Sequence, residues 1–476
     1  MRTVICLFCS LLLMNELTLS QTKSGEIDAL MQKYYEYGQF NGSVLVAQGG
    51  KVILKKGYGY ANFEWNIPNT PDTKFRLASV TKQFTAMLIM QQVEGGKISL
   101  DAPVITYLPK YPKPQGEKVT IRHLLTHTSG IHNYTIGLGT KEKREIVTPG
   151  ELVSKFSDRP LEFEPGSKYS YSNSGYVLLG AILEAVTGKP YEDLIEEKIF
   201  RPLGMLNSGY DHQETILDKR ASGYEMSVTR INAPLIDMTI PFSAGALYST
   251  VEDLYLWDRA LYSDKLLSEA NKRIYFTPGL NNYAFGWDVQ KERIGNGADS
   301  VLMIHHSGGI DGFGTIIARL PDRQDLIVLL NNTGAISLIG IARTIAAILY
   351  DKPYDSPRKS LATVLGQSIA SGTVQNIRAE FLRLKGLSKE YNLDEGEVNL
   401  LGYRLMAAHN MGAAIDVLTL NVESFPRSWN VYDSLGEAYM NSGQKELAIR
   451  NYEKSIELNP NNASGIETLK KLKDAR

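Results

Sequence analysis

The chain contains the stretch Phe75-Arg76-Leu77-Ala78-Ser79-Val80-Thr81-Lys82, followed by apolar residues at helical spacing up to Met90. Positions i and i+3 of a helix lie on one face, so Ser79 and Lys82 are expected to point into the same space. A serine hydroxyl is a weak nucleophile until a neighbouring group removes its proton. A lysine that is partly desolvated, and whose pKa has therefore fallen, can be that group. The stretch predicts a nucleophilic serine and its base at the start of a buried helix.

The same Ser-x-x-Lys spacing occurs at Ser20, Ser356 and Ser442, so the spacing alone carries little weight. An isolated match is explained equally well by a serine helix cap followed by a solvated lysine. Ser79 differs from the other three because it alone opens a long apolar helix.

A second motif, Tyr171-Ser172-Asn173, lies in a polar, turn-rich segment that leads into an apolar helix over 177–186. A tyrosine hydroxyl can shuttle a proton, and an asparagine two residues later can hydrogen-bond a catalytic side chain or an amide. The alternative is a turn tyrosine with an asparagine helix cap. The Tyr-x-Asn spacing recurs at Tyr60 and Tyr439, so the spacing alone does not identify a catalytic tyrosine.

The third motif is His306-Ser307-Gly308-Gly309, which follows an apolar run over 301–304. Two glycines remove side chains where a ligand would approach backbone N–H groups, and such groups can form half of an oxyanion hole. The alternative is a strand end with a glycine turn. If the segment is a strand, His305 and His306 face opposite sides, so only one of them can line a site.

Together and in this order, the three motifs resemble those of the serine β-lactamase and penicillin-binding superfamily. The branch that is most similar contains class C β-lactamases, D-alanyl-D-alanine carboxypeptidases and esterases. The resemblance extends from about Gly38 to Tyr350. It includes three further segments: 120–130 (Thr-Ile-Arg-His-Leu-Leu-Thr-His-Thr-Ser-Gly), 202–205 (Pro-Leu-Gly-Met) and 244–250 (Ala-Gly-Ala-Leu-Tyr-Ser-Thr).

The resemblance implies two-step acyl transfer through an ester on Ser79. It assigns Lys82 as the base and Tyr171 as the proton relay to the leaving group. The backbone N–H groups of Ser79 and Gly309 would form the oxyanion hole. No metal or organic cofactor is implied.

Substrate contacts are implied for Asn173, His306, Gly308 and Gly309. Histidine at 306 departs from the lysine of the Lys-Thr-Gly motif and is mostly neutral near pH 7. This departure weakens the case for a β-lactamase, so an esterase or a D-peptidase is expected at least as readily.

A different class of function stays open, in which an inactive penicillin-fold domain binds a ligand and the C-terminal repeats recruit a partner.

We expect an α+β fold over residues 21–351. Residues 42–60 alternate around Gly49-Gly50, and residues 313–331 alternate around a turn at 321–324, as in β-hairpins. Helices are expected over 26–37 and 336–350. Strands at both ends suggest one antiparallel sheet assembled from distant segments. The resemblance adds flanking helices and a mostly helical subdomain, with the site at their junction.

Residues 352–373 are predicted to be a linker, and 374–476 an all-α helical-repeat domain. Leu401, Gly402, Ala414 and Pro426 recur 34 residues later. This period resembles the tetratricopeptide repeat, with units at 395–428 and 429–462 and a capping helix at 463–473. Two interpretations stay open: a surface that binds a protein or peptide partner, or a stabilising appendage.

Residues 1–20 are typical of a secretory signal, with Arg2 before an apolar core. Both cysteines, Cys6 and Cys9, lie in this segment, so the mature chain would contain none and could form no disulfide. We therefore expect a periplasmic or secreted bacterial protein with no membrane span after signal cleavage.

Charge and composition exclude some classes of partner. The formal net charge is −1 with both signs interspersed, which argues against a nucleic-acid-binding surface.

His123 and His127 have the i, i+4 spacing of a helical zinc site, but the glutamate of His-Glu-x-x-His is absent. We expect both to be structural. The aromatic segment 283–287 is expected to form a wall near the cleft or to pack in the core.

Overall fold

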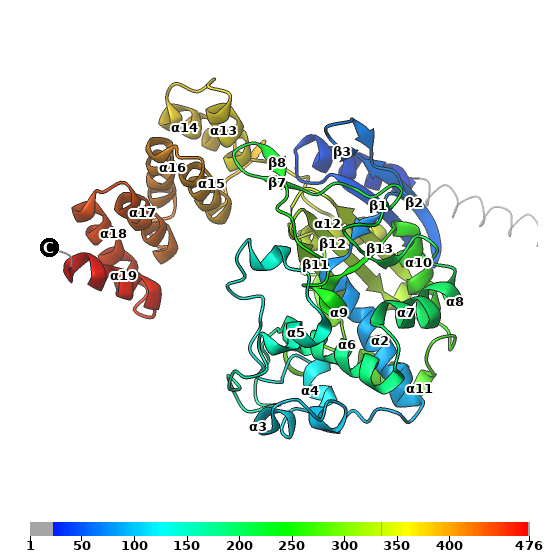
Figure 1. The fold of residues 1–476 in the computed structure, drawn as a ribbon. Coiled ribbons are helices and arrows are strands. Elements are labelled where there is room, and N and C mark those ends of the chain that lie inside the picture. Colours follow the sequence, from blue (N-terminus) through cyan, green and yellow to red (C-terminus); the bar gives the residue numbers. More distant parts are fainter. Residues whose placement is uncertain (1–21, 335, 475–476) are drawn as a thin grey trace, which may run out of the picture. The chain divides into compact units, whose positions relative to one another are not determined.

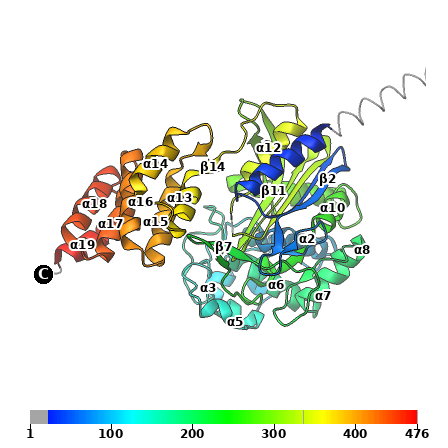
Figure 2. The same ribbon diagram turned by 90° about the horizontal axis from the view of Figure 1, so that it is seen from above.

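The computed structural model describes residues 22–334 and 336–474. These residues form two compact units, shown in Figures 1 and 2. The first consists of the chain up to Glu225 together with Asn232–Asp355, and the second of Met226–Ile231 together with the chain from Ser356. The first unit is an α+β domain and the second is mainly helical, as predicted. The predicted signal segment, residues 1–20, lies outside the described residues.

Six antiparallel strands form the main sheet of the first unit, in the order β10-β11-β12-β13-β1-β2. Their bounds are β1 Gly42–Gln48, β2 Lys51–Tyr58, β10 Asp288–Arg293, β11 Ser300–Ile310, β12 Phe313–Leu320 and β13 Asp325–Asn331. The two predicted hairpins are confirmed as β1–β2 and β12–β13. They join through β1 and β13, where Gly42 lies opposite Asn331 and Ala47 lies opposite Leu326. The sheet therefore unites strands from both ends of the domain.

Side chains alternate along the strands and enter two separate cores. Val44 and Val46 face a core that includes the helix over 22–36 and α12 (Ile339–Leu349). Leu45 and Ala47 face the larger core, which includes α2 (Thr81–Glu94) and α10 (Val251–Ala260). Helices therefore cover both faces of the sheet, as Figure 2 shows.

The chain between β2 and β10 forms the mostly helical subdomain that the family resemblance implied. Its remaining helices are α3 Lys113–Gly116, α4 Ile121–Leu125, α5 Pro149–Ser154, α6 Asn173–Thr187, α7 Tyr191–Ile195, α8 Arg201–Leu203, α9 Phe242–Gly245 and α11 Glu269–Phe276. Short strands pair beside them: β3 Tyr60–Asn62 with β4 Ile67–Pro68, and β9 Leu247–Ser249 with β5 Phe75–Arg76 and β6 Gly209–Tyr210. Strands β7 Tyr224–Met226 and β8 Arg230–Asn232 also pair, and most of their residues belong to the second unit. Helix α6 packs against α2, α4 and α9. This packing brings the serine motif and the tyrosine motif together.

The second unit contains the predicted repeats. Its helices are α13 Leu361–Ala370, α14 Ile377–Gly386, α15 Glu395–Ala407, α16 Met411–Ser424, α17 Trp429–Asn441, α18 Lys445–Leu458 and α19 Ala463–Asp474, with a short parallel pair of β14 Lys359–Ser360 and β15 Tyr391–Asn392. The two repeats are α15–α16 and α17–α18. A Cβ on Gly402 would lie 2.5 Å from the Leu418 side chain, and one on Gly436 would lie 3.2 Å from the Tyr452 ring. Both glycines allow the paired helices to approach closely.

The linker predicted at 352–373 is wrong from Leu361 onward, where α13 begins. Leu361 and Leu365 are fully buried in the core of the second unit, together with Phe381 and Leu384 of α14. Helices α13 and α14 pack on each other, and also on α15 and α16 respectively. They form an additional pair, so the stack contains three helical pairs before α19.

No helix within residues 22–334 and 336–474 combines the length and the apolar character needed to span a bilayer.

Candidate active site

Ser79 lies in a 3₁₀ turn, Ala78–Val80, that leads directly into α2. The helix therefore begins two residues later than the sequence predicts. Ala78 has a φ of +49°, in the left-handed region that costs a residue with a Cβ about 1–2 kcal/mol. The turn leaves Ser79 partly exposed, whereas Ala78 and Val80 on either side are buried. A substrate can therefore reach the hydroxyl.

Lys82 is fully buried and has three polar partners. Its Nζ lies 2.9 Å from Ser79 Oγ, 2.8 Å from Asn173 Oδ1 and 2.8 Å from the carbonyl oxygen of Ala244. The amide and carbonyl oxygens can only accept, so two N–H bonds of Lys82 point to them. A neutral amine has two N–H bonds and one lone pair. In that state the lone pair faces the hydroxyl of Ser79.

Burial lowers the pKa of Lys82 well below its ordinary value. Its hydrogen-bond partners among the described residues include no carboxylate that would offset the cost of burying an ammonium group. The surroundings of Lys82 therefore favour the neutral amine, which can take a proton from Ser79.

Tyr171 covers the other side of the lysine, with Lys82 Nζ 4.9 Å from the centre of its ring. Burial raises the pKa of Tyr171, and a hydrogen bond with Ser79 opposes that rise in part. The tyrosine therefore keeps its proton while the lysine loses its own. Of the two groups beside Ser79, Lys82 is the one suited to be the base and Tyr171 the one suited to donate.

Asn173 is the first residue of α6, so the helix begins earlier than the predicted 177. Its Oδ1 accepts from Lys82, and its Nδ2 donates to Thr135 Oγ1 at 3.1 Å. Its backbone N–H donates to Asn133 Oδ1 at 3.2 Å. These contacts fix the amide, and through it the position of the Lys82 amine.

The adjacent histidines of β11 face opposite sides of the sheet. His305 lies 3.3 Å from Glu292 Oε1, away from the serine. His306 lies beside Tyr171, with ring centres 6.4 Å apart. Its Nδ1 donates to the carbonyl of Ser307 at 2.7 Å, and its Nε2 accepts from the Tyr283 hydroxyl at 2.9 Å. Burial lowers the pKa of His306 to about 3, so the ring is neutral.

Gly308 brings β11 against the turn that carries Ser79. A Cβ there would lie 2.2 Å from the carbonyl oxygen of Leu77, so only glycine fits. Strand β10 pairs with β11 only as far as His305, whereas β12 pairs along the whole stretch up to Ile310. The edge of β11 beyond His305 therefore has no strand partner among the described residues. Gly309 lies on this stretch and borders the same pocket as Ser79.

His127 does not share a helix face with His123, contrary to the i, i+4 prediction. Helix α4 ends at Leu125, and His127 has a φ of +56°. His123 caps α4 instead, while His127 is buried and its Nδ1 accepts from the Ser172 N–H at 3.2 Å. Its ring lies 4.2 Å from that of Tyr171, centre to centre. His127 therefore supports the segment that carries the tyrosine motif.

Tyr283 contributes to the site, but its neighbours do not. Its ring packs 4.6 Å from His127, and its hydroxyl reaches His306. Phe285 and Trp287 are buried in the larger core. Within the described part of the chain, no group of three or more His, Cys, Asp and Glu side chains is placed to hold a metal ion.

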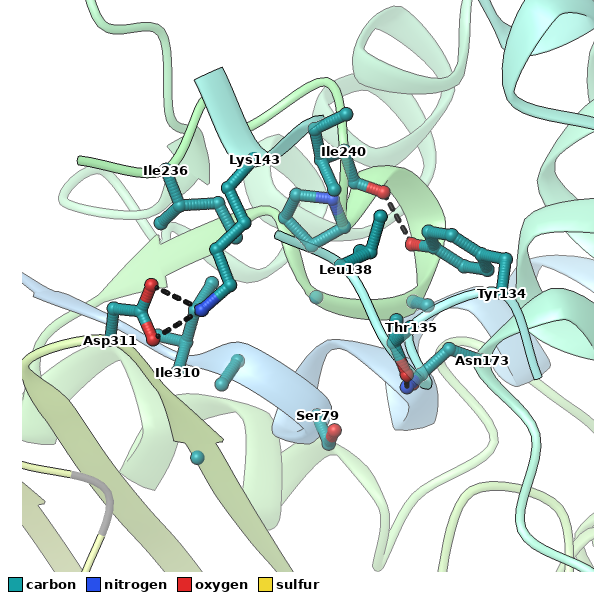
Figure 3. A pocket seen from close by; sticks show the side chains of 15 residues that line it. Ser79, Tyr134, Thr135, Leu138, Lys143, Asn173, Ile236, Ile240, Ile310 and Asp311 are labelled. Carbon is teal, nitrogen blue, oxygen red and sulfur yellow. Dashed lines mark hydrogen bonds and ion pairs between the residues drawn. The ribbon is translucent and has the colours of Figure 1, made fainter. Parts of the chain in front are cut away.

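A pocket of about 240 Å³ opens at Ser79 (Figure 3). Several of its lining residues were not singled out from the sequence: Tyr134, Thr135, Leu138, Lys143, Ile236, Ile240, Ile310 and Asp311. Most of them lie in irregular loops, which carry no periodic signal. Asp311 follows the Gly308-Gly309 motif by two residues, and that proximity was the one available clue.

The fold, and a serine held against a buried lysine, define a class of proteins that transfer acyl groups through serine. Residues 27–365 match the family described as Beta-lactamase, and the chain belongs to that family. Residues 429–462 match the tetratricopeptide repeat. The family and the fold class predicted from the sequence are thus confirmed.

Several known proteins are similar to this chain. Penicillin-binding protein 4* of Bacillus subtilis (strain 168) is 32% identical over 366 residues, which cover 72% of this chain and 79% of that protein. A penicillin binding protein from Bacillus halodurans is 29% identical, with a TM-score of 0.58, covering 66% of this chain and 97% of that one. D-amino acid amidase from Ochrobactrum anthropi SV3 is 25% identical, with a TM-score of 0.60, covering 69% and 98%.

Proposed function

We propose that the protein is an exported serine hydrolase that cleaves an ester, a D-amino-acid peptide or amide, or a β-lactam through an acyl-enzyme on Ser79. The observation that carries this proposal is the 2.9 Å contact between Ser79 Oγ and the amine of a fully buried Lys82. Membership of a family that includes penicillin-binding proteins supports the reaction class. The D-amino acid amidase among the structural relatives supports an amide as substrate.

In the acylation step, Ser79 Oγ attacks the carbonyl carbon of the substrate and its proton passes to Lys82. The carbonyl oxygen gains negative charge and accepts from the backbone N–H groups of Ser79 and Gly309. The bond to the leaving group then breaks. The leaving group takes a proton from Tyr171, and Lys82 returns its proton to the tyrosine. The product is an ester on Ser79.

In the second step, water attacks this ester and gives its proton to the same Lys82–Tyr171 pair. The bond to Ser79 Oγ breaks, the serine regains a proton, and a carboxylic acid leaves. Water is the only co-reactant, Lys82 returns to the neutral amine, and Tyr171 returns to the protonated phenol.

The neutral His306 bears on the choice of substrate. A lysine at this position would offer a fixed positive charge to a substrate carboxylate. With a pKa of about 3, His306 offers none at neutral pH. This difference favours esters and uncharged amides over β-lactams within the proposed range.

A fluorophosphonate probe followed by intact-mass measurement tests the proposal. We expect one adduct on the wild type and none on Ser79→Ala, with turnover reduced by at least about 10³-fold in that variant. Ser442→Ala is the matched control, because Ser442 has the same Ser-x-x-Lys spacing but lies in a repeat turn. It should label like the wild type. Absence of an adduct on all three proteins would contradict the proposal and favour the inactive ligand-binding alternative.

Export and partner binding are further parts of the proposal. The signal-like residues 1–20 support a periplasmic or secreted location. The tetratricopeptide match at 429–462 supports a peptide or protein partner at the repeats. Sequencing the N-terminus of the exported protein tests the first of these, with a new terminus near Gln21 expected.

A further inference from the structure

We propose that the pocket beside Ser79 accepts an uncharged aliphatic acyl group, and that the ion pair between Lys143 and Asp311 sets this preference. The two charges of the pocket cancel each other, so neither is available to a charged substrate. The inference rests on the proposed function, because it concerns the acyl half of the substrate that Ser79 attacks.

The position of the pocket identifies which half of the substrate it holds. The pocket opens at Ser79 and is bounded by Asn173 and Gly309. Neither Tyr171 nor His306 is among the described residues that line it. In the proposed reaction the leaving group takes its proton from Tyr171 and departs on that side. The acyl group therefore extends in the other direction, into the pocket.

Aliphatic side chains form much of the wall. They come from separate loops and from the end of β11, and they are Leu138, Ile236, Ile240, Pro241 and Ile310. The volume of about 240 Å³ is smaller than the roughly 300–1,000 Å³ of pockets for drug-sized ligands, which favours a short acyl chain. Each methylene buried against this wall is expected to raise kcat/KM by about fourfold.

Lys143 and Asp311 are the only charged side chains among the described residues that line the pocket. Lys143 Nζ donates to both carboxylate oxygens of Asp311, at 3.0 and 2.8 Å, as the dashed lines in Figure 3 show. The side chains are only 29% and 22% exposed. Separating such a pair leaves two poorly solvated charges, which is costly. A charged acyl group would therefore have to break a stable contact.

Backbone contacts hold both partners in place independently of their charges. The carbonyl of Lys143 accepts from the Asp237 N–H at 2.8 Å. The N–H of Gly312, next to Asp311, donates to Glu225 Oε1 at 2.7 Å. Removing one charge should therefore leave the backbone of the other residue in place and its charged group available to the pocket.

Three p-nitrophenyl esters, each with six acyl carbons, test the inference on the full chain. They are the hexanoate, the ω-carboxylate adipate half-ester and the ω-ammonium 6-aminohexanoate. The readout is kcat/KM at pH 7.5, expressed as the ratio of each charged ester to the hexanoate. For the wild type we expect both ratios to be below about one tenth, because a charged end gains nothing in this pocket and loses hydration.

The single variants should shift these ratios in opposite directions. Asp311→Asn frees Lys143 and should raise the adipate ratio about tenfold, and Lys143→Met frees Asp311 and should raise the 6-aminohexanoate ratio similarly. The double variant, Lys143→Met with Asp311→Asn, should return both kcat/KM ratios to their wild-type values. It controls for changes in packing or folding. Wild-type ratios near one, or single variants whose ratios do not move, would overturn the inference while hexanoate turnover upheld the proposed function. Failure of both hexanoate turnover and fluorophosphonate labelling would overturn the proposed function and the inference with it.

Discussion

The variant Lys82→Met separates the two charge states open to the buried amine. In the unfolded chain a lysine has a pKa of about 10.4 and is protonated between pH 7 and pH 9. In the folded protein, burial lowers the pKa of Lys82 well below that value. The unfolded state then binds more protons than the folded state, so the free energy of unfolding rises with pH. The slope is about 1.4 kcal/mol per pH unit as long as the pH lies between the two pKa values.

Methionine does not titrate, so the variant lacks this slope. We expect the unfolding free energy of the wild type, minus that of the variant, to increase from pH 7 to pH 9, by at most about 2.7 kcal/mol, because the full slope applies only above the folded-state pKa of Lys82. Other groups cancel in the difference. His306, for example, has a folded-state pKa of about 3 and is neutral throughout this window.

Urea unfolding at pH 7, 8 and 9, followed by tryptophan fluorescence, measures this difference. Trp257 and Trp287 are fully buried in the first unit and report on the domain that contains Lys82. A difference that stays constant over the two pH units would show that the folded protein keeps Lys82 protonated. That result would refute the assignment of this amine as the resting base.

Two further substitutions test the packing described above. Gly308→Ala places a methyl group 2.2 Å from the Leu77 carbonyl oxygen. We expect it to displace β11 and lower ester kcat/KM by about 100-fold with unchanged circular dichroism, whereas a loss below about threefold would contradict the close approach. Leu418→Ala truncates a fully buried side chain. It should lower the unfolding free energy of the second unit by about 2–5 kcal/mol in urea titrations followed by circular dichroism. Ser79 labelling should stay unchanged, and a loss of labelling would contradict a purely local effect.

Much of the fold could be predicted because its signals are local. Alternation around Gly49-Gly50 and around 321–324 specifies each hairpin from neighbouring residues alone. Strands at both ends of the domain suggested one antiparallel sheet, but the pairing of β1 with β13 joins distant segments and was not predicted. The helical segment after Leu361 was missed because Pro353 and Pro357 precede it, and these indicate a linker. The apolar face of α13 is buried against α14 and α15, and the sequence of α13 alone does not show this contact.

Part of the candidate active site could also be predicted from local sequence. Ser79 and Lys82 are neighbours in sequence, so their contact follows from local geometry. Lys143 lies in a short 3₁₀ helix, Glu142–Arg144, and Asp311 lies in the turn after β11. Their contact joins segments 168 positions apart, and no periodicity in either segment indicates it. The i, i+4 spacing of His123 and His127 indicated a shared helix face, which was wrong because that rule holds only inside a helix and α4 ends two residues before His127.

The pairing of β1 with β13 also orders events during synthesis. Asn41 donates its N–H to Asn331 Oδ1 across 290 positions of sequence. At about 5–20 residues per second, the ribosome needs roughly 15–60 s to make the intervening chain. Until then β1 and β2 form an isolated hairpin, which is marginally stable in water. The nascent chain therefore carries Ser79 and Lys82 long before Gly309 emerges, and the proposed acyl transfer would have to wait for the last strands of the domain.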